Sequence, residues 1–428
     1  MFAHILSSTG KRMVKFTVLG GSSVAVPELI SAIIPHMHDG RELEVVLHGR
    51  DAHKLELVAR VCKGMAQAVP GLTVESTTNL GAALDGAEFV LNQVRVGGLA
   101  ARAYDETFPH RWDIPGEETV GPGGAANAMR TIPVVLELCR AIEQHAPHAT
   151  LLTFSNPSSV VQRAIALTTH LKVIGLCDAP YTMHHTVAKS LEVFPSEVET
   201  QYVGMHHFGW ITSAIVDGFE RLPDVLADDA ACNILGIAPE IGRALGVLPH
   251  PYFRYFFHPD RMLKKQKSAS QPRAIELQQL EGDLLKVYAD YSGGGKPEAV
   301  NKRSAIWYKA VVVPVLIALA FGDPARLAVN IENNGLVPGL SDDTIIEISA
   351  RIEEGLIHTT PPIDLPPPAM MGMLGANAAY ERTLVNAILN SSADLLLQAF
   401  LMNPLIPSYD VAKSIIHQLW PLKGWPEA

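Results

Sequence analysis

Short apolar runs alternate with amphipathic segments along the first half of the chain, and the two patterns predict different elements. Apolar runs predict buried strands at 14–19, 44–47, 88–94, 149–154 and 172–176. Helical periodicity follows the first two of these strands, at 27–37 and 54–68. Strands that alternate with helices predict an α/β fold with a Rossmann-like, doubly wound parallel sheet.

The second half of the chain has a less regular pattern. Helical periodicity predicts helices at 302–321, 342–354 and 378–401, and one apolar run predicts a strand at 327–331. A chain of 428 residues is long enough for two domains. We therefore predict a Rossmann-like domain over 13–202, followed over 203–428 by an α+β domain for substrate binding and oligomerisation. The long apolar segments near the C-terminus favour a homodimer or a homotetramer.

Composition and charge narrow the class of protein. Hydrophobic residues make up 48% and charged residues 18% of the chain, as in ordinary globular enzymes. The net charge of -10 argues against nucleic acid or an anionic membrane as a partner, because such partners need clustered Lys and Arg. An anionic small molecule is compatible with this charge, since one or two local cations can bind it.

The cysteines and the apolar runs bear on the location of the protein. No apolar run approaches the roughly 18 residues of a membrane span, and residues 1–13 lack the apolar stretch of a signal peptide. Four widely spaced cysteines without a CxxC pair indicate a reducing compartment, so we expect a cytoplasmic protein. They are Cys62, Cys139, Cys177 and Cys232.

A glycine-rich turn follows the first predicted strand. Gly20, Gly21, Ser22 and Ser23 stand between this strand and a helix. Glycines let the backbone approach a pyrophosphate, and a helix N-terminus supplies amide donors, so the turn predicts a dinucleotide site. The second strand ends in Arg50 rather than in an acidic residue for the ribose hydroxyls. Arg50 favours a 2'-phosphate or stacks on adenine; we predict NAD and leave NADP open.

Polar strings follow or adjoin the other predicted strands, where ligands bind in such sheets. One string contains Arg95, a second begins at Glu118, a third is Asn156-Pro157 and a fourth begins at Cys177. In a scaffold without function these positions would be plain turns. Four polar strings at one edge of one sheet therefore indicate an active site.

Cysteine and histidine side chains in this set point to a metal. Cys177 and the pair His206-His207 carry ligand types that suit a first-row transition metal, although each also fits a buried core. Two protein ligands would leave coordination positions open for substrate oxygens. Tyr308 either packs in a core or, close to cations and a metal, loses its proton more easily and serves as a base.

The order of these motifs resembles that of glycoside hydrolase family four from residue 14 to about residue 400. The motifs are Gly-Gly-x-Ser, Asn-Gln-x-Arg-Val-Gly-Gly, Glu-Thr-x-Gly-Pro-Gly-Gly, Asn-Pro, Gly-Leu-Cys-Asp-x-Pro, His, Lys-Arg-(x)4-Tyr and Asn-Asn-Gly. The resemblance implies an NAD- and manganese-dependent glycosidase that does not use the common two-carboxylate mechanism. It implies oxidation at C3 of the sugar, deprotonation at C2, loss of the aglycone, addition of water and re-reduction.

The resemblance also implies roles for single residues. It assigns Cys177 and His207 to the metal, Tyr308 to the C2 base and Asp178 to protonation of the leaving group. It assigns four residues to the substrate, with a phosphate held by the first of them: Arg95, Glu118, Asn156 and Arg303.

Departures from the family pattern leave several alternatives open. His206 replaces the usual Asn, so either histidine of the pair can be the metal ligand. The whole chain is most similar to 6-phospho-β-glucosidases, whereas Asp178 is typical of 6-phospho-α-glucosidases. A sulfoquinovoside or a uronide is an alternative anionic substrate. A second alternative is a hydroxy-acid dehydrogenase that shares the Rossmann-like domain.

Overall fold

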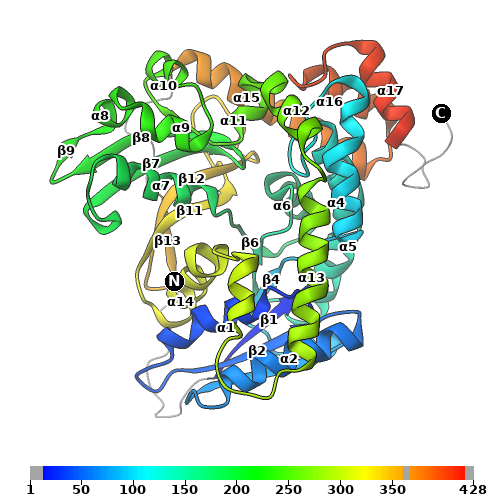
Figure 1. The fold of residues 1–428 in the computed structure, drawn as a ribbon, viewed down its shortest axis with the longest axis vertical. Coiled ribbons are helices and arrows are strands. Elements are labelled where there is room, and N and C mark those ends of the chain that lie inside the picture. Colours follow the sequence, from blue (N-terminus) through cyan, green and yellow to red (C-terminus); the bar gives the residue numbers. More distant parts are fainter. Residues whose placement is uncertain (1–12, 360–366, 420–428) are drawn as a thin grey trace.

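The computed structural model describes residues 13–359 and 367–419. Residues 420–428, the end of the predicted second domain, and the N-terminal residues 1–12 lie outside this part of the chain. The described chain folds around one large sheet with helices on both of its faces (Figure 1).

Six parallel strands from the first half form one side of the sheet. Their order is β3-β2-β1-β4-β5-β6, and every pair among them is parallel. This order confirms the predicted doubly wound arrangement, whose switch point lies between β1 and β4. The strands are β1 (Met13–Leu19), β2 (Glu42–His48), β3 (Leu72–Thr77), β4 (Phe89–Asn92), β5 (Thr150–Thr153) and β6 (Lys172–Gly175).

Antiparallel strands from the rest of the chain continue the same sheet. β11 pairs with β6, and the order then runs β12, β7, β8 and β10. The sheet therefore crosses residue 203, and the predicted division into two domains there stays a prediction. These strands are β7 (Val198–Met205), β8 (Phe208–Val216), β9 (Phe219–Glu220), β10 (Leu248–Pro249), β11 (Ala325–Glu332), β12 (Ile345–Glu353) and β13 (Leu356–Thr359).

Helices bury the two faces of the sheet in separate cores. One core packs α1, α2, α13 and α14 on the sheet, and a second packs α5, α6 and α15 to α17. A third packs α7, α8, α9 and the start of α15 on the antiparallel strands β7, β8 and β12. The helices of the first half are α1 (Val26–Ile33), α2 (Ala52–Ala66), α3 (Leu80–Leu84), α4 (Gly98–Thr107), α5 (Gly121–His145), α6 (Ser158–Thr168) and α7 (Ala179–Ser190). Those of the second half are α8 (Leu222–Ala227), α9 (Asp229–Leu235), α10 (Pro239–Leu245), α11 (Phe253–Phe257), α12 (Pro259–Ser268), α13 (Arg273–Ala289), α14 (Val313–Phe321), α15 (Pro368–Leu389), α16 (Ala393–Met402) and α17 (Tyr409–Leu419).

Short tight turns of helix link these elements. Four are 3-10 turns and the fifth is a π-helical turn that leads into α14. They are η1 (Ile34–His36), η2 (Phe108–Trp112), η3 (Pro195–Glu197), η4 (Glu298–Arg303) and η5 (Tyr308–Val312). None of the helices in the described ranges is long and apolar enough to cross a membrane.

Several predicted elements of the second half were wrong. The helix predicted at 342–354 is strand β12, in which Ile346, Ile348 and Ile352 alternate along a buried strand. The helix predicted at 378–401 is two helices, because Ser392 caps a new helix by accepting a hydrogen bond from the backbone of Leu395. Several strands were not predicted, namely β3 in the first half of the chain and then β7, β8, β9, β10 and β13.

Candidate active site

The carboxyl ends of the parallel strands meet the turn between β7 and β8. The glycine-rich turn and three of the polar strings follow parallel strands, and the two histidines form the β7–β8 turn. The string at Glu118 instead leads into helix α5. The site is therefore built on the junction between the parallel and antiparallel parts of the sheet.

The turn after β1 lies at the switch point of the sheet. The backbone amides of Gly20 and Gly21 both donate to the carbonyl of His48, at 3.2 and 2.7 Å. A Cβ on Gly21 would lie 2.8 Å from the backbone nitrogen of His48, so no side chain fits there. Arg50, two residues beyond this carbonyl, is exposed. The turn is therefore compact and free of side chains at Gly20 and Gly21, at the edge where doubly wound sheets bind dinucleotides.

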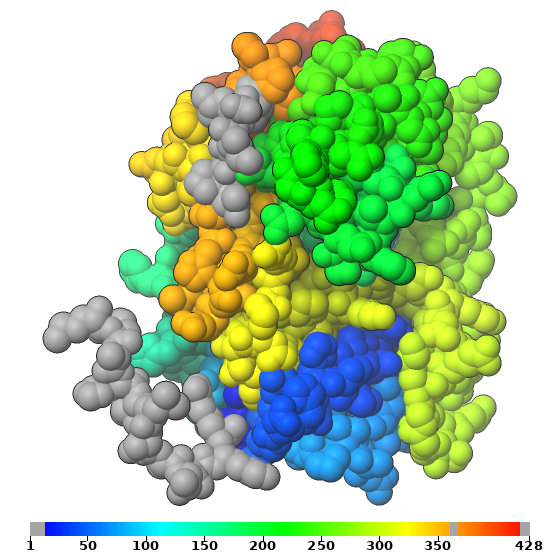
Figure 2. All heavy atoms as spheres, turned by 90° about the vertical axis from the view of Figure 1, so that its left-hand side faces the viewer, coloured from blue at the N-terminus to red at the C-terminus, as the bar shows by residue number. Residues whose placement is uncertain are grey.

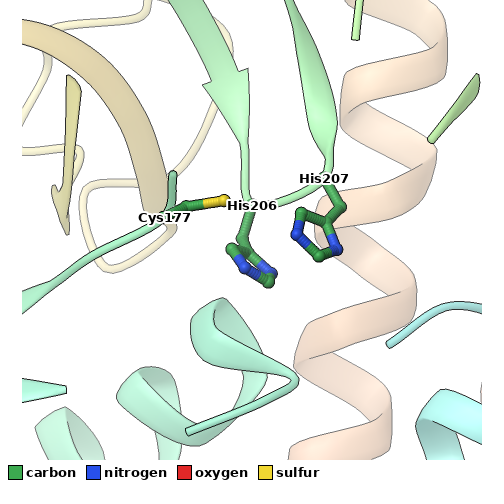
Figure 3. A group of neighbouring side chains, drawn as sticks. All are labelled: Cys177, His206 and His207. Atoms are coloured by element: carbon green, nitrogen blue, oxygen red, sulfur yellow. The ribbon is translucent and has the colours of Figure 1, made fainter. Parts of the chain in front are cut away.

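Three potential metal ligands lie together where β6 ends and the β7–β8 turn begins. The ligand atoms of Cys177, His206 and His207 all lie within 4.8 Å of one another, and all three residues are buried. His206 and His207 are the two residues of the tight turn that connects Met205 with Phe208. His207 has a left-handed backbone with φ of 61°. Figure 3 shows the sulfur of Cys177 directed toward this turn.

Burial decides the protonation of these side chains. It lowers the pKa of His206 to about 3. Burial and the neighbouring His206 hold the pKa of His207 well below its usual range. Burial raises the pKa of the Cys177 thiol, and the nearby Glu347 carboxyl adds to the shift. Both imidazoles are therefore neutral, which is the form that binds metals, whereas the thiol must release a proton to bind one.

A second layer of side chains surrounds His207, in contacts that no motif of the sequence predicts. The ring of Tyr252 stacks on the His207 ring with centroids 3.7 Å apart. Thr119 Oγ1 lies 2.9 Å from His207 Nδ1 and donates to Glu117. The hydroxyl of Tyr252 donates to the other oxygen of Glu117 at 3.4 Å. Glu117 and Tyr252 are thus site residues that the motif analysis missed.

Glu118 is the centre of an ion-pair network. Its buried carboxylate accepts hydrogen bonds from Arg95 and lies 3.1 Å from Arg102. Burial opposes ionisation, but Arg95, Arg102 and the side chain of Asn156 together lower the pKa of Glu118 below its usual value. Two of the other predicted substrate residues, Arg95 and Asn156, therefore both contact Glu118.

Arg303 lies near this network without an anionic partner. No carboxylate within the described ranges lies within salt-bridge distance of its guanidinium, which sits 4.9 Å from the ring centroid of Trp307. Burial lowers the pKa of Arg303, and the positive charges of Arg102, Arg95 and Arg273 lower it further. Arg95, Arg102 and Arg273 are each paired with a carboxylate, so Arg303 is the cation of this region whose charge is left to attract an anion.

Two catalytic predictions remain, Tyr308 and Asp178. The hydroxyl of Tyr308 donates to Gln93 at 2.7 Å, and Gln93 donates to the carbonyl of Gly20. Tyr308 is therefore tied to the glycine-rich turn. Burial raises its pKa, contrary to the easier deprotonation that its predicted surroundings suggested. Asp178 is the residue after Cys177 and precedes the first turn of α7.

Comparisons with known proteins agree with this geometry. The sequence model described as "Family 4 glycosyl hydrolase" matches residues 15–193, and that of the "Family 4 glycosyl hydrolase C-terminal domain" matches residues 202–406. A probable 6-phospho-β-glucosidase of Bacillus subtilis is 33% identical over 423 residues, which cover 95% of each chain. A maltose-6'-phosphate glucosidase of the same organism is 25% identical over 442 residues, covering 97% of this chain and 98% of the relative.

A solved structure shares the whole architecture. It is the 6-phospho-β-glucosidase of Thermotoga maritima with manganese, NAD+ and glucose-6-phosphate. Its TM-score is 0.85 at 26% identity, and the match covers 96% of this chain and 98% of that one.

Proposed function

Since the chain belongs to family 4 of the glycosyl hydrolases, we propose that it hydrolyses 6-phospho-glycosides with NAD and a divalent metal such as Mn²⁺. One observation supports the proposal most directly. The adjacent residues Glu118 and Thr119 join the arginine region to the Cys–His cluster, because Glu118 pairs with Arg95 and Thr119 contacts His207. An anionic sugar and a metal would therefore meet at one place.

We assign the two cofactors to separate parts of the site. Gly20, Gly21, Ser22 and Ser23 would hold the pyrophosphate of NAD, with Arg50 beyond the turn. Cys177 and His207 would hold the metal. When bound, NAD supplies reversible hydride transfer and the metal supplies Lewis-acid polarisation of a sugar oxygen.

Residues of the chain would remove the C2 proton and protonate the leaving group. Family resemblance assigns the C2 base to Tyr308, but the geometry favours Tyr252, whose ring packs on the proposed metal ligand His207. The hydroxyl of Tyr252 already donates to Glu117, a carboxylate that can receive a proton. Asp178, next to Cys177, is our proposed proton donor to the leaving group.

The arginines would bind the anionic group. Arg303 lacks a carboxylate partner within residues 13–359 and 367–419, and Arg95 keeps one side of its guanidinium near Glu118. A phosphate between them would receive charge-assisted hydrogen bonds. A sulfonate or a uronate would meet the same cations, and both anomers remain candidates because relatives act on either. A hydroxy-acid dehydrogenase is set aside, because both halves match the glycosidase family.

The experiment is hydrolysis of nitrophenyl 6-phospho-β-glucoside and its α-anomer, with and without NAD, Mn²⁺ and a chelator. We expect turnover of one anomer that needs both additions and stops with the chelator. Turnover without NAD, or turnover of the unphosphorylated glucosides at an equal rate, would refute the proposal. Activity only on sulfonated or uronic glycosides would keep the mechanism and change the substrate.

We further propose a cytoplasmic homodimer or homotetramer. All four cysteines are buried free thiols, as expected in a reducing compartment. Large apolar side chains near α16 and α17 are solvent-exposed in the single chain, including Leu401 at 57% and Tyr409 at 52%. Light scattering of the purified protein tests the assembly, and a monomer at micromolar concentration would contradict it.

A further inference from the structure

The hydroxyl of Thr119 lies between a carboxylate and an imidazole. It donates to Glu117 Oε2 and lies 2.9 Å from His207 Nδ1. The backbone N–H of Thr119 donates to the same oxygen of Glu117 at 2.5 Å. Glu117 and His207 are both buried, so water does not compete for these bonds.

The number of hydroxyl protons on Thr119 determines the direction of its hydrogen bond with His207. Glu117 also accepts from the backbone N–H of Thr119 and from the hydroxyl of Tyr252, so its carboxylate is the acceptor for the single proton of the Thr119 hydroxyl. The hydroxyl oxygen of Thr119 can then only accept from His207, so Nδ1 of the neutral imidazole must carry the hydrogen. The lone pair of His207 is left on Nε2.

We propose that Thr119 is a positioning residue that holds His207 in the Nδ1–H tautomer and leaves Nε2 free to bind the metal. The inference deepens the metal part of the proposed function and rests on it. Metal-binding histidines commonly donate their second ring N–H to a partner that fixes ring and tautomer. Here the partner is a hydroxyl, held in turn by the carboxylate of Glu117.

The same geometry distinguishes His206 from His207, either of which could be the metal ligand by sequence alone. His207 has a hydrogen-bond partner for Nδ1 and a ring stacked on each side, from His206 and from Tyr252. The ring of His206 makes no hydrogen bond within the described ranges of the chain. His207 is therefore the metal ligand of the pair, and His206 packs against it.

The test uses Thr119→Val, which keeps the shape but removes the hydroxyl, and Thr119→Ser, which keeps the hydroxyl. We expect Thr119→Val to weaken Mn²⁺ binding in calorimetry by about 10-fold to 100-fold. Thr119→Ser should bind Mn²⁺ within about threefold of wild type. Thr107→Val is the matched control, because the Thr107 hydroxyl bonds only to the backbone of its own helix α4.

A second readout does not need the metal. In ¹⁵N spectra of the metal-free protein labelled at histidine, we expect His207 to show a protonated Nδ1 and an unprotonated Nε2. His207→Asn identifies its signals by their loss. We expect the single tautomer to become a mixture in Thr119→Val and to be restored in Thr119→Ser.

Three results would overturn the inference. One is an Nε2–H tautomer of His207 in the wild-type protein, and another is unchanged Mn²⁺ affinity in Thr119→Val. The third is loss of Mn²⁺ binding in His206→Asn but not in His207→Asn. If the wild-type protein binds no Mn²⁺, the metal part of the proposed function fails, while the spectra still decide the tautomer.

Discussion

The contacts of a tyrosine hydroxyl determine whether it can act as the base at C2. Burial raises the pKa of both Tyr252 and Tyr308, so their positions must distinguish them. Tyr252 stacks on His207, whereas Tyr308 holds Gln93 and through it the turn at Gly20. These contacts predict different consequences when each hydroxyl is removed.

Tyr252→Phe should lower kcat at least about 100-fold and abolish exchange of the C2 proton with solvent deuterium, since a general base contributes about this much. Tyr308→Phe should raise the Kd for NAD about fivefold, because one hydrogen bond contributes about 1 kcal/mol. Steady-state kinetics, NMR of the sugar product and NAD titration measure these effects. Loss of C2 exchange in Tyr308→Phe alone would return the base role to Tyr308.

Arg303 is the residue most suited to recognise the charge of the substrate. Arg303→Ala should raise KM for the phosphorylated glycoside by about tenfold or more, because a charge-assisted hydrogen bond is lost. KM for the unphosphorylated glycoside should not change. Arg60→Ala is the control, since the Arg60 side chain is exposed on the outer face of α2 and pairs with Glu56. An equal loss on both substrates would assign Arg303 to folding rather than to phosphate recognition.

At the scale of residues, the chemical type of a side chain can be read from the sequence, whereas its contacts cannot. Cys177, His206 and His207 could be selected because their side chains bind metals, and the structure brings these three together. The ring of Tyr252 on His207 could not be selected, because Tyr252 lies in an aromatic segment that also suits a core. The direction of the Thr119 hydrogen bond depends on a distance that no spacing along the chain encodes.

At the scale of elements, burial explains which predictions succeeded. The central strands β1, β4 and β5 are buried on both faces and give continuous apolar runs. Edge strand β3 alternates buried Leu72 and Val74 with exposed residues, so its apolar signal is weaker. In β12 the apolar residues at 345, 348 and 352 also fit helical spacing, which led to the wrong prediction.

The turn between β1 and α1 leaves no space for a side chain at Gly21. Gly21→Ala would place its Cβ 2.8 Å from both the His48 backbone nitrogen and the Leu47 Cβ. We expect a loss of about 1 to 3 kcal/mol in the free energy of unfolding and weaker NAD binding, because the turn must shift. Gly282→Ala is the control, since its Cβ would meet nothing within 4 Å in α13. That control should raise stability by up to about 1 kcal/mol. Urea unfolding and NAD titration distinguish the two variants.

Helix α15 carries a buried carboxyl that makes stability depend on pH. Burial raises the pKa of Glu381 to about 7 from its ordinary 4.5, against the hydrogen bonds from Ser159 and Asn377. A raised folded-state pKa contributes stability below pH 4.5 that is lost as pH rises through about 7. One pKa unit corresponds to about 1.4 kcal/mol, so the loss is on the order of 3 kcal/mol at pH 8.

Glu381→Gln should therefore remove this pH dependence. We expect the variant to gain stability over wild type between pH 5 and pH 8 in urea unfolding. Glu56→Gln, at an exposed site on α2, should follow the wild-type curve at both pH values. A stability difference between Glu381→Gln and wild type that stays constant with pH would mean that Glu381 is already ionised in the folded protein.

At the scale of the molecule, the two halves of the chain share their cores. The first core joins strands β1 and β2 to Leu284 and Tyr288 of α13 and to α14. In Figure 2 the yellow segment of the second half lies directly against the blue N-terminal part. The hydroxyl of Tyr288 donates to the Val24 carbonyl at 2.6 Å, next to the glycine-rich turn. The second half thus supports the proposed cofactor site as well as the metal site.

Because both halves contribute to the same cores, we expect residues 13–202 not to fold as an independent domain. A fragment of residues 13–202 would expose the face that α13 and α14 cover and the edge of β6 that pairs with β11. We expect it to bind the dye ANS, to lack a cooperative thermal transition and to bind no NAD, because exposed apolar faces and open strand edges favour association over folding. Adding residues 203–428 as a second chain should restore the transition if the cores reassemble. A fragment that unfolds cooperatively and binds NAD with wild-type affinity would instead make 13–202 an independent domain.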